Sequence, residues 1–218
     1  MIARTRIKVC GMTDMAEASG VVATGVDALG FIFVEASPRN IVPEKAREIV
    51  ASLPPFVDAV GVFVDQELDV VNDIVKYCGL TMVQLHGSES PQYCEDVNAR
   101  VVKTFSIRPD AEVSETNPFY DPYLDSVSGI LLDTYHEKVA GGTGQTFDWD
   151  LIQKCRPGAP LILAGGLNPD NIDEAIRQVR PFSVDVNSGV EISPGVKDIG
   201  AVERLVESVR ATDRAING

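Results

Sequence analysis

The chain has 218 residues, 32 of them acidic and 19 basic, so its formal net charge at pH 7 is −13. Hydrophobic residues make up 44% and charged residues 23%, a composition that can form a buried core and excludes a disordered chain. The negative charge argues against nucleic acid and anionic membranes as partners, and no apolar run approaches the roughly 18 residues that a membrane span needs.

Short apolar runs rich in β-branched residues recur along the chain, separated by segments with helix signals. Most of these runs are apolar throughout, as expected for parallel strands that are buried on both faces. The predicted strands cover residues 7–9, 28–33, 59–64, 82–85, 101–105, 130–132, 161–163 and 183–186.

Helix-start signals lie between these strands. Asp14 and Glu17 form a variant of the capping box, and Pro43 suits a first helical turn. Asn168 and Pro169 predict an N-cap and a first-turn proline for a helix over 170–179. Other helices are predicted over 67–78, 89–97, 149–154 and 199–210, whereas 108–125 and 134–146 are expected to be long connections.

Eight strand–helix units in one chain of this length fit a compact (β/α)₈ TIM barrel, formed by a single domain over residues 1–218. An open, doubly wound sheet is the alternative. In a barrel the reactive side chains lie at the carboxyl ends of the strands and in the loops that follow. This rule selects the candidate site residues.

Two glycine-containing loops are candidates for binding phosphate. Gly165 and Gly166 follow the seventh predicted strand, and Ser188 and Gly189 follow the eighth. Glycine lets main-chain N–H groups approach an anion closely, and barrels frequently bind phosphate after these two strands. Each loop taken alone could be an ordinary turn, but the two together favour a phosphorylated small molecule as the substrate.

Two side chains at strand ends are candidates for proton transfer. Cys10 follows the first strand on the same face as Lys8, and a neighbouring cation lowers the pKa of a thiol. Asp133 ends the sixth strand, where partial removal from water favours the protonated form of a carboxyl group. A buried structural cysteine and an aspartate that caps its own loop are the alternatives.

Three further polar residues follow strands or lie on them. Arg39 is a candidate clamp for a substrate carboxylate, because its planar guanidinium can donate two hydrogen bonds, although it could equally be a surface arginine. Asp185 is expected to face the lumen, where pairing with a lysine competes with binding a substrate hydroxyl. His86 is interpreted as a neutral imidazole that holds a loop.

Cysteine and histidine usage indicates the compartment and argues against a metal. Cys78, Cys94 and Cys155 are expected to be buried, reduced residues, and the absence of a CxxC pair favours the cytoplasm. The two histidines have no ligand spacing, so neither a metal nor a cofactor is predicted. The oligomeric state is left open between monomer and homodimer.

Nine segments, taken in order, resemble the phosphoribosylanthranilate isomerase family, and the ordered set is far more specific than any one segment. The segments are 8–13, 30–33, 37–39, 61–64, 83–87, 132–133, 141–149, 163–167 and 185–191. Two positions depart from the family pattern, because many members have Lys where Gln145 stands and Ser where Asn187 stands.

The resemblance implies an Amadori rearrangement of N-(5-phosphoribosyl)anthranilate to 1-(2-carboxyphenylamino)-1-deoxyribulose 5-phosphate in tryptophan biosynthesis. It implies that Asp133, as general acid, protonates the ribose ring oxygen, and that Cys10, as general base, takes the proton from the ribose C2. By the same resemblance Arg39 would bind the anthranilate carboxylate and Asp185 would lie near the ribose hydroxyls. The phosphate would be held by Gly166, Ser188 and Gly189.

Three rival functions are compared with this interpretation. The sister isomerase of the histidine pathway has a carboxylate where Cys10 stands in this chain, so Cys10 decides against it. A metal-dependent ribulose-phosphate epimerase would require His and Asp ligands, and two histidines are too few. The third is a binding module that has kept the phosphate loops and lost activity. The presence of both Cys10 and Asp133 argues against the binding module.

Overall fold

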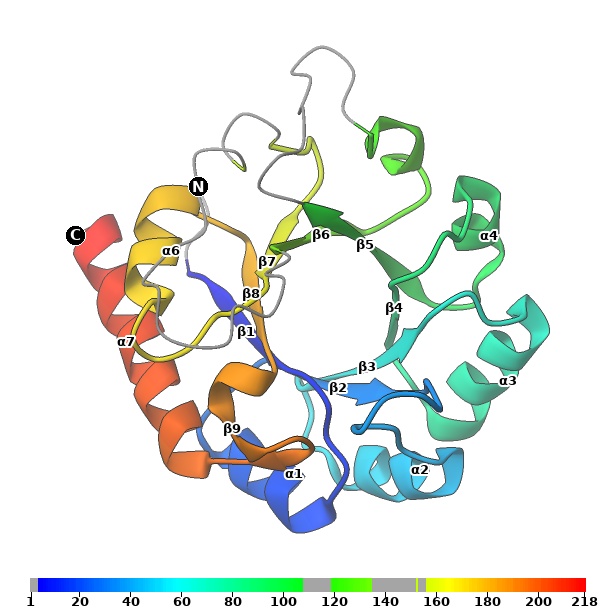
Figure 1. The fold of residues 1–218 in the computed structure, drawn as a ribbon, viewed down its shortest axis with the longest axis horizontal. Helices are drawn as coiled ribbons and strands as arrows, with labels where there is room; N and C mark the ends of the chain where they lie inside the picture. The colour runs from blue at the N-terminus through cyan, green and yellow to red at the C-terminus, as the bar shows by residue number, and fades with distance from the viewer. Residues whose placement is uncertain (1–3, 108–118, 135–151, 153–155) are drawn as a thin grey trace.

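The barrel is closed by pairing between the first and last strands of the sheet. We describe it from a computed structural model that covers residues 4–107, 119–134, 152 and 156–218. Eight parallel strands follow one another around the ring in chain order, and β1 pairs with β8 (Figure 1), which confirms the (β/α)₈ class and excludes an open sheet. The strands are β1 (Arg6–Val9), β2 (Ala28–Ile32), β3 (Asp58–Phe63), β4 (Met82–Leu85), β5 (Arg100–Ile107), β6 (Gly129–Thr134), β7 (Leu161–Ala164) and β8 (Ser183–Val186).

Helices surround the ring of strands on its outside (Figure 1). They are α1 (Met15–Ala23), α2 (Pro43–Ser52), α3 (Leu68–Cys78), α4 (Pro91–Asp96), α6 (Ile172–Val179) and α7 (Ile199–Asn217). Two 3₁₀ turns, η1 (Asp121–Tyr123) and η2 (Ser188–Val190), and a short hairpin of β9 (Glu191–Ser193) and β10 (Val196–Lys197) complete the described elements.

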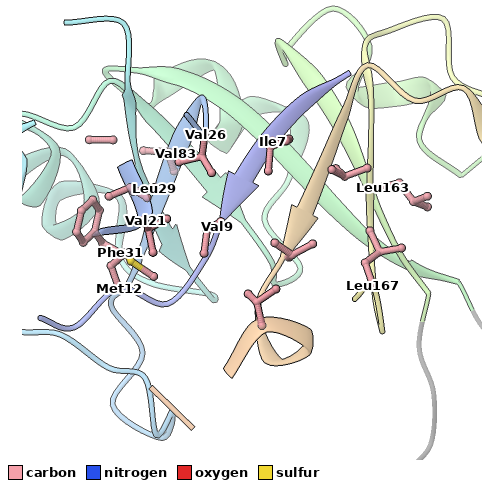
Figure 2. Packing of buried hydrophobic residues seen from close by; sticks show 14 of the residues in the cluster. Ile7, Val9, Met12, Val21, Val26, Leu29, Phe31, Val83, Leu163 and Leu167 are labelled. Carbon is pink, nitrogen blue, oxygen red and sulfur yellow. The ribbon is translucent and has the colours of Figure 1, made fainter. Parts of the chain in front are cut away.

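The strands are apolar throughout because they contribute to two separate cores. Residues such as Ile7, Val9 and Leu29 belong to the larger core between the strands and the helices (Figure 2). A smaller cluster fills part of the lumen and consists of Val102, Leu131, Ile162 and Ala164. Alternate side chains of one strand therefore face different cores, which leaves polar lumen positions near the carboxyl ends for chemistry.

Two of the three predicted helix starts are found, and one is wrong. Asp14 accepts hydrogen bonds from the N–H groups of Ala16 at 2.8 Å and Glu17 at 3.1 Å, and Pro43 is the first residue of α2. The predicted cap at Asn168 is wrong, because α6 begins at Ile172. Short polar side chains favour turns as well as N-caps, and Asn168 Oδ1 closes a local turn by accepting from the N–H of Asp170 at 2.8 Å.

Some predictions concern residues that the structure does not describe. They are the helix over 149–154 apart from Ile152, which is helical, the loop over 134–146 beyond Thr134, Gln145 and Cys155. In the described part of 108–125 the only regular element is η1. The extent of the single domain over 1–218 stays a prediction. Within the described ranges, no helix has both the length and the apolar character that crossing a membrane requires.

Candidate active site

A pocket of about 610 Å³ lies at the carboxyl ends of the barrel strands, a size typical of small-molecule sites. Loops or strand ends from β1, β2, β6, β7 and β8 contribute to it. All eight candidate residues line this pocket: Cys10, Arg39, Asp133, Gly165, Gly166, Asp185, Ser188 and Gly189. The structure thus brings the eight together, while the roles assigned to them stay predictions.

Cys10 is buried next to an ion pair in the barrel lumen. Lys8 Nζ lies 2.7 Å from Asp185 Oδ2, and both side chains are almost completely buried. Burial raises the pKa of the Cys10 thiol, and the charge of Lys8 opposes this effect without overcoming it. Lys8 therefore acts in the direction expected from the sequence, but the net pKa shift is upward because removal from water has the larger effect.

Glycine on the neighbouring strand leaves room for the thiol. A Cβ atom at Gly30 of β2 would lie 2.6 Å from Cys10 Sγ, closer than real Cβ contacts allow. Gly30 belongs to one of the segments that resemble the family, but no reason for a glycine there was apparent from the sequence. The structure shows the reason, because a side chain at this position would collide with the Cys10 thiol.

Asp185 faces the lumen as expected and pairs with a lysine, the first of its two predicted possibilities. Its Oδ2 accepts from Lys8, whereas Oδ1 is buried and has no hydrogen-bond partner among the described residues. A buried carboxylate oxygen without a donor costs free energy, so a ligand hydroxyl that donates to Oδ1 would be favourable.

Asp133 lies beside His86, and both residues line the pocket. His86 Nε2 is 3.6 Å from Asp133 Oδ2, and about a third of each side chain is exposed (33% and 31%). Burial lowers the pKa of His86, although the charges of Asp133 and Asp185 oppose this effect. His86 is therefore neutral at pH 7, in agreement with its interpretation as an uncharged imidazole.

A buried ion pair that sequence reasoning missed braces the loop that carries His86. Lys103 Nζ lies 3.2 Å from Glu89 Oε2 and donates to the carbonyl of Gly87 at 2.7 Å. Glu89 in turn accepts from the N–H groups of Gly87 at 3.0 Å and Asp65 at 2.9 Å. Neither charged residue belongs to a local pattern, because the pairing joins β5 to the loops after β3 and β4.

Arg39 forms a bidentate ion pair with Glu191, a residue for which no role was predicted from the sequence. Arg39 Nε donates to Glu191 Oε1 at 2.8 Å and Nη2 donates to Oε2 at 2.6 Å. Lys197 Nζ approaches the same carboxylate at 2.6 Å. Burial alone would raise the pKa of Glu191, but hydrogen bonds from Arg39 and Lys197 lower it to about 2.

The loops after β7 and β8 touch at the pocket. Gly165 and Gly166 have φ angles of 93° and 63°, in the left-handed region that favours glycine. A Cβ atom at Gly189 would lie 1.9 Å from the carbonyl oxygen of Leu167. Main chain from the two loops therefore approaches as closely as glycine permits, and the side-chain amide of Asn171 donates to the Gly166 carbonyl at 3.0 Å.

The described residues also limit the chemistry that the chain supplies by itself. Among them, no group of three or more His, Cys, Asp or Glu side chains is arranged to hold a metal ion. Cys10, Cys78 and Cys94 are buried free thiols. The groups available in the pocket include a thiol, carboxyl groups, a guanidinium, an imidazole, side-chain amides, hydroxyls and main-chain N–H groups.

Comparisons with known proteins agree with this arrangement. Residues 7–208 match the family model of N-(5′-phosphoribosyl)anthranilate isomerase. The enzyme of that name from Geotalea uraniireducens is 46% identical over 206 residues, which cover 94% of this chain and 98% of the relative.

Solved structures give the same family. Monomers of the dimeric phosphoribosylanthranilate isomerase from Thermotoga maritima superpose with a TM-score of 0.78 at 37% identity, covering 95% of this chain and 99% of that one. A phosphoribosylanthranilate isomerase in complex with reduced 1-(o-carboxyphenylamino)-1-deoxyribulose 5-phosphate superposes with a TM-score of 0.79 at 38% identity, with the same coverage. The chain therefore belongs to the N-(5′-phosphoribosyl)anthranilate isomerase family and is an isomerase.

Proposed function

We propose that the chain converts N-(5′-phosphoribosyl)anthranilate to 1-(2-carboxyphenylamino)-1-deoxyribulose 5-phosphate in tryptophan biosynthesis, with Cys10 as general base and Asp133 as general acid. One observation carries the assignment of residues: a single pocket contains this thiol, this carboxyl group, an arginine and two glycine-rich loops. Membership of the isomerase family supports the reaction class.

The two anionic ends of the substrate bind at different places. Main-chain N–H groups of Gly166, Ser188 and Gly189 hold the phosphate, which suits a protein whose overall negative charge repels anions. Arg39 binds the anthranilate carboxylate. The reacting ribose then lies between the loops and Arg39, where Asp185 Oδ1 accepts a hydrogen bond from a sugar hydroxyl.

The rearrangement proceeds by two proton transfers. Asp133 protonates the ribose ring oxygen, the bond between C1 and that oxygen breaks, and the nitrogen lone pair forms a C1–N iminium. The Cys10 thiolate then removes the C2 proton, and the C2–H electron pair forms a C1–C2 double bond as the iminium is neutralised. The resulting enolamine takes a proton at C1 and loses its enol proton to give the C2 ketone.

Lys8 helps to form the reactive state of the thiol. The charged amine stabilises the thiolate in a site where burial disfavours it. The iminium makes the C2 proton acidic, so a thiolate has sufficient basicity. Shielding the thiolate from water keeps this base reactive.

A direct assay separates this function from a binding module. Phosphoribosylanthranilate fluorescence is followed during incubation with the purified chain, and depletion that requires the protein is expected. A chain that binds the substrate without consuming it would be a binding module, and the proposed function would be wrong.

Arg39→Ala is expected to raise the KM for phosphoribosylanthranilate by roughly tenfold or more, because a charge-assisted carboxylate contact is lost. The inhibition constant of inorganic phosphate, which lacks the carboxylate, changes much less. Arg100→Ala is the matched control, since Arg100 pairs with Asp58 at the opposite end of the barrel. Equal losses for substrate and phosphate would argue against a carboxylate clamp at Arg39.

Gly189→Ala is expected to weaken phosphate binding and to destabilise the fold by about 1–3 kcal/mol, because the added methyl group collides with the Leu167 carbonyl. Thermal unfolding and phosphate inhibition measure the two effects. Gly158→Ala is the control, because a Cβ atom there meets nothing within 4 Å. Similar behaviour of the two variants would show that the contact between the loops does not shape a phosphate site.

The remaining assignments concern partners and location. We propose a phosphorylated small molecule as the only class of ligand, with no nucleic-acid partner, in the cytoplasm. The Thermotoga maritima relative is dimeric, and for this chain the choice between monomer and homodimer is decided by light scattering.

A further inference from the structure

Three charged side chains form a row that ends at the pocket. Lys197 and Glu191 are cross-strand partners in the β9–β10 hairpin, and Glu191 bridges Lys197 to Arg39. Exposure increases along the row, from 0% for the Lys197 side chain through 4% for Glu191 to 18% for Arg39. Arg39 lines the pocket, whereas Lys197 is completely shielded from solvent.

The contact with Glu191 fixes which edge of the guanidinium can meet a ligand. Glu191 occupies the edge formed by Nε and Nη2 of Arg39. The second edge, formed by Nη1 and the other hydrogen of Nη2, is the one left for a planar carboxylate. Arg39 is thereby held in one orientation, which reduces the conformational entropy that binding would otherwise cost.

The same contact neutralises the charge of Arg39, and Lys197 restores a net positive charge beside it. Arg39 and Glu191 alone have no net charge, so a second carboxylate would meet a neutral pair. Lys197 adds one positive charge at 2.6 Å from Glu191 Oε1, and the three groups together carry +1. Lys197 also donates to Asn187 Oδ1 at 2.9 Å, which ties the row to the loop after β8.

We propose that Lys197 is a positioning residue for substrate binding: by balancing the charge of Glu191, it keeps the free edge of Arg39 attractive to the anthranilate carboxylate. The inference rests on the proposed function, because it takes Arg39 as the carboxylate clamp. It adds a residue that does not touch the substrate and nevertheless determines selectivity for a carboxylate-bearing sugar phosphate.

Direct binding tests the proposal without depending on turnover. Calorimetry compares reduced 1-(o-carboxyphenylamino)-1-deoxyribulose 5-phosphate, which carries the carboxylate, with ribose 5-phosphate, which lacks it. Lys197→Met is expected to weaken the first ligand about tenfold and the second by less than about twofold. In turnover the same variant raises KM, and kcat also falls, because the charge of Lys197 lowers the pKa of the Cys10 thiol. Equal weakening of both ligands, or none, would overturn the proposal.

A double variant distinguishes charge balance from a merely structural role. Glu191→Gln combined with Lys197→Met restores a net charge of +1 around Arg39, so binding of the carboxylate ligand returns to within about threefold of wild type. Lys197→Arg, which keeps the charge, is expected to bind both ligands as wild type does. A double variant as weak as Lys197→Met would overturn the proposal, and the double variant decides the question if the single one does not fold.

Lys103→Met is the matched control for losing a buried lysine. Lys103 is likewise buried and paired with a glutamate, Glu89, but it belongs to a different cluster. The control is expected to lower the Tm and to leave the affinity ratio of the two ligands unchanged. A wild-type chain that binds neither ligand would instead reject the proposed function, so the two failures are distinguishable.

Discussion

Cys10→Ser is expected to lower kcat by roughly 10³-fold, because general base catalysis typically contributes about 10²–10⁴-fold. Serine has nearly the same shape as cysteine, so the variant keeps its fold and its affinity for substrate. The hydroxyl group ionises far less readily than the thiol, even beside Lys8, and the C2 proton therefore lacks an acceptor. Stopped-flow or steady-state fluorescence measures the loss. Near-wild-type turnover would contradict the role of Cys10.

A buried thiol elsewhere in the chain supplies the control. Cys94 is 2% exposed, and burial raises its pKa to about 11, but it lies outside the pocket lining. Cys94→Ser is expected to retain kcat within about twofold, as substitutions remote from the chemistry usually do. A loss of activity in Cys94→Ser comparable to that in Cys10→Ser would point to general destabilisation instead of catalysis.

The pH dependence follows from the protonation states of Cys10 and Asp133. The base is the thiolate, whose fraction grows as pH rises, and burial raises the pKa of this thiol above its ordinary value. The acid is the protonated Asp133, whose fraction falls as pH rises. Wild-type kcat/KM is therefore expected to decline toward both acid and alkaline pH. A kcat/KM that keeps rising into the alkaline range would contradict the role of Asp133, and one that does not fall in acid would contradict the role of the Cys10 thiolate.

The barrel itself was predictable because its strands have an unusual pattern. Strands such as β3 and β7 are apolar at consecutive positions, which indicates burial on both faces, and recurring helix signals indicate parallel connections. The predicted ends of several strands differ from the observed ends by one or two residues. The start of α6 was wrong because Asn168 closes a turn with the same side-chain oxygen that caps helices.

The candidate site was predictable only as far as chain order and strand ends determine it. Placing residues at the carboxyl ends of strands was enough to collect Cys10, Asp133 and Arg39 in one pocket. The network behind Arg39 could not be predicted, because Glu191 and Lys197 lie in a short polar hairpin whose sequence gives no sign of burial. Their burial depends on contacts with residues that are distant in the sequence, such as Arg39.

The pKa shift of Cys10 could be predicted only in part from the sequence. Sequence spacing places Lys8 on the same face and gives the correct sign for its own effect. The net direction depends on how much water the folded barrel excludes, and no local pattern reports that quantity.

Asp133→Asn is also expected to lower kcat by roughly 10²–10⁴-fold, because the amide cannot donate the proton that opens the ribose ring. The amide matches the shape of the carboxyl group and remains within reach of His86, so binding and Tm stay close to wild type. Asp58→Asn is the control, since Asp58 lies at the other end of the barrel and pairs with Arg100 in an exposed contact that contributes little.

The two catalytic assignments differ in which step each variant slows, and C2-deuterated substrate distinguishes them. In Cys10→Ser, removal of the C2 proton limits turnover, so deuterium lowers the rate further. In Asp133→Asn, ring opening precedes that transfer and becomes limiting, so the deuterium effect on kcat approaches one. A large isotope effect in Asp133→Asn would mean that this carboxyl group acts at the C2 proton transfer, and the division of labour between Asp133 and Cys10 would then be wrong.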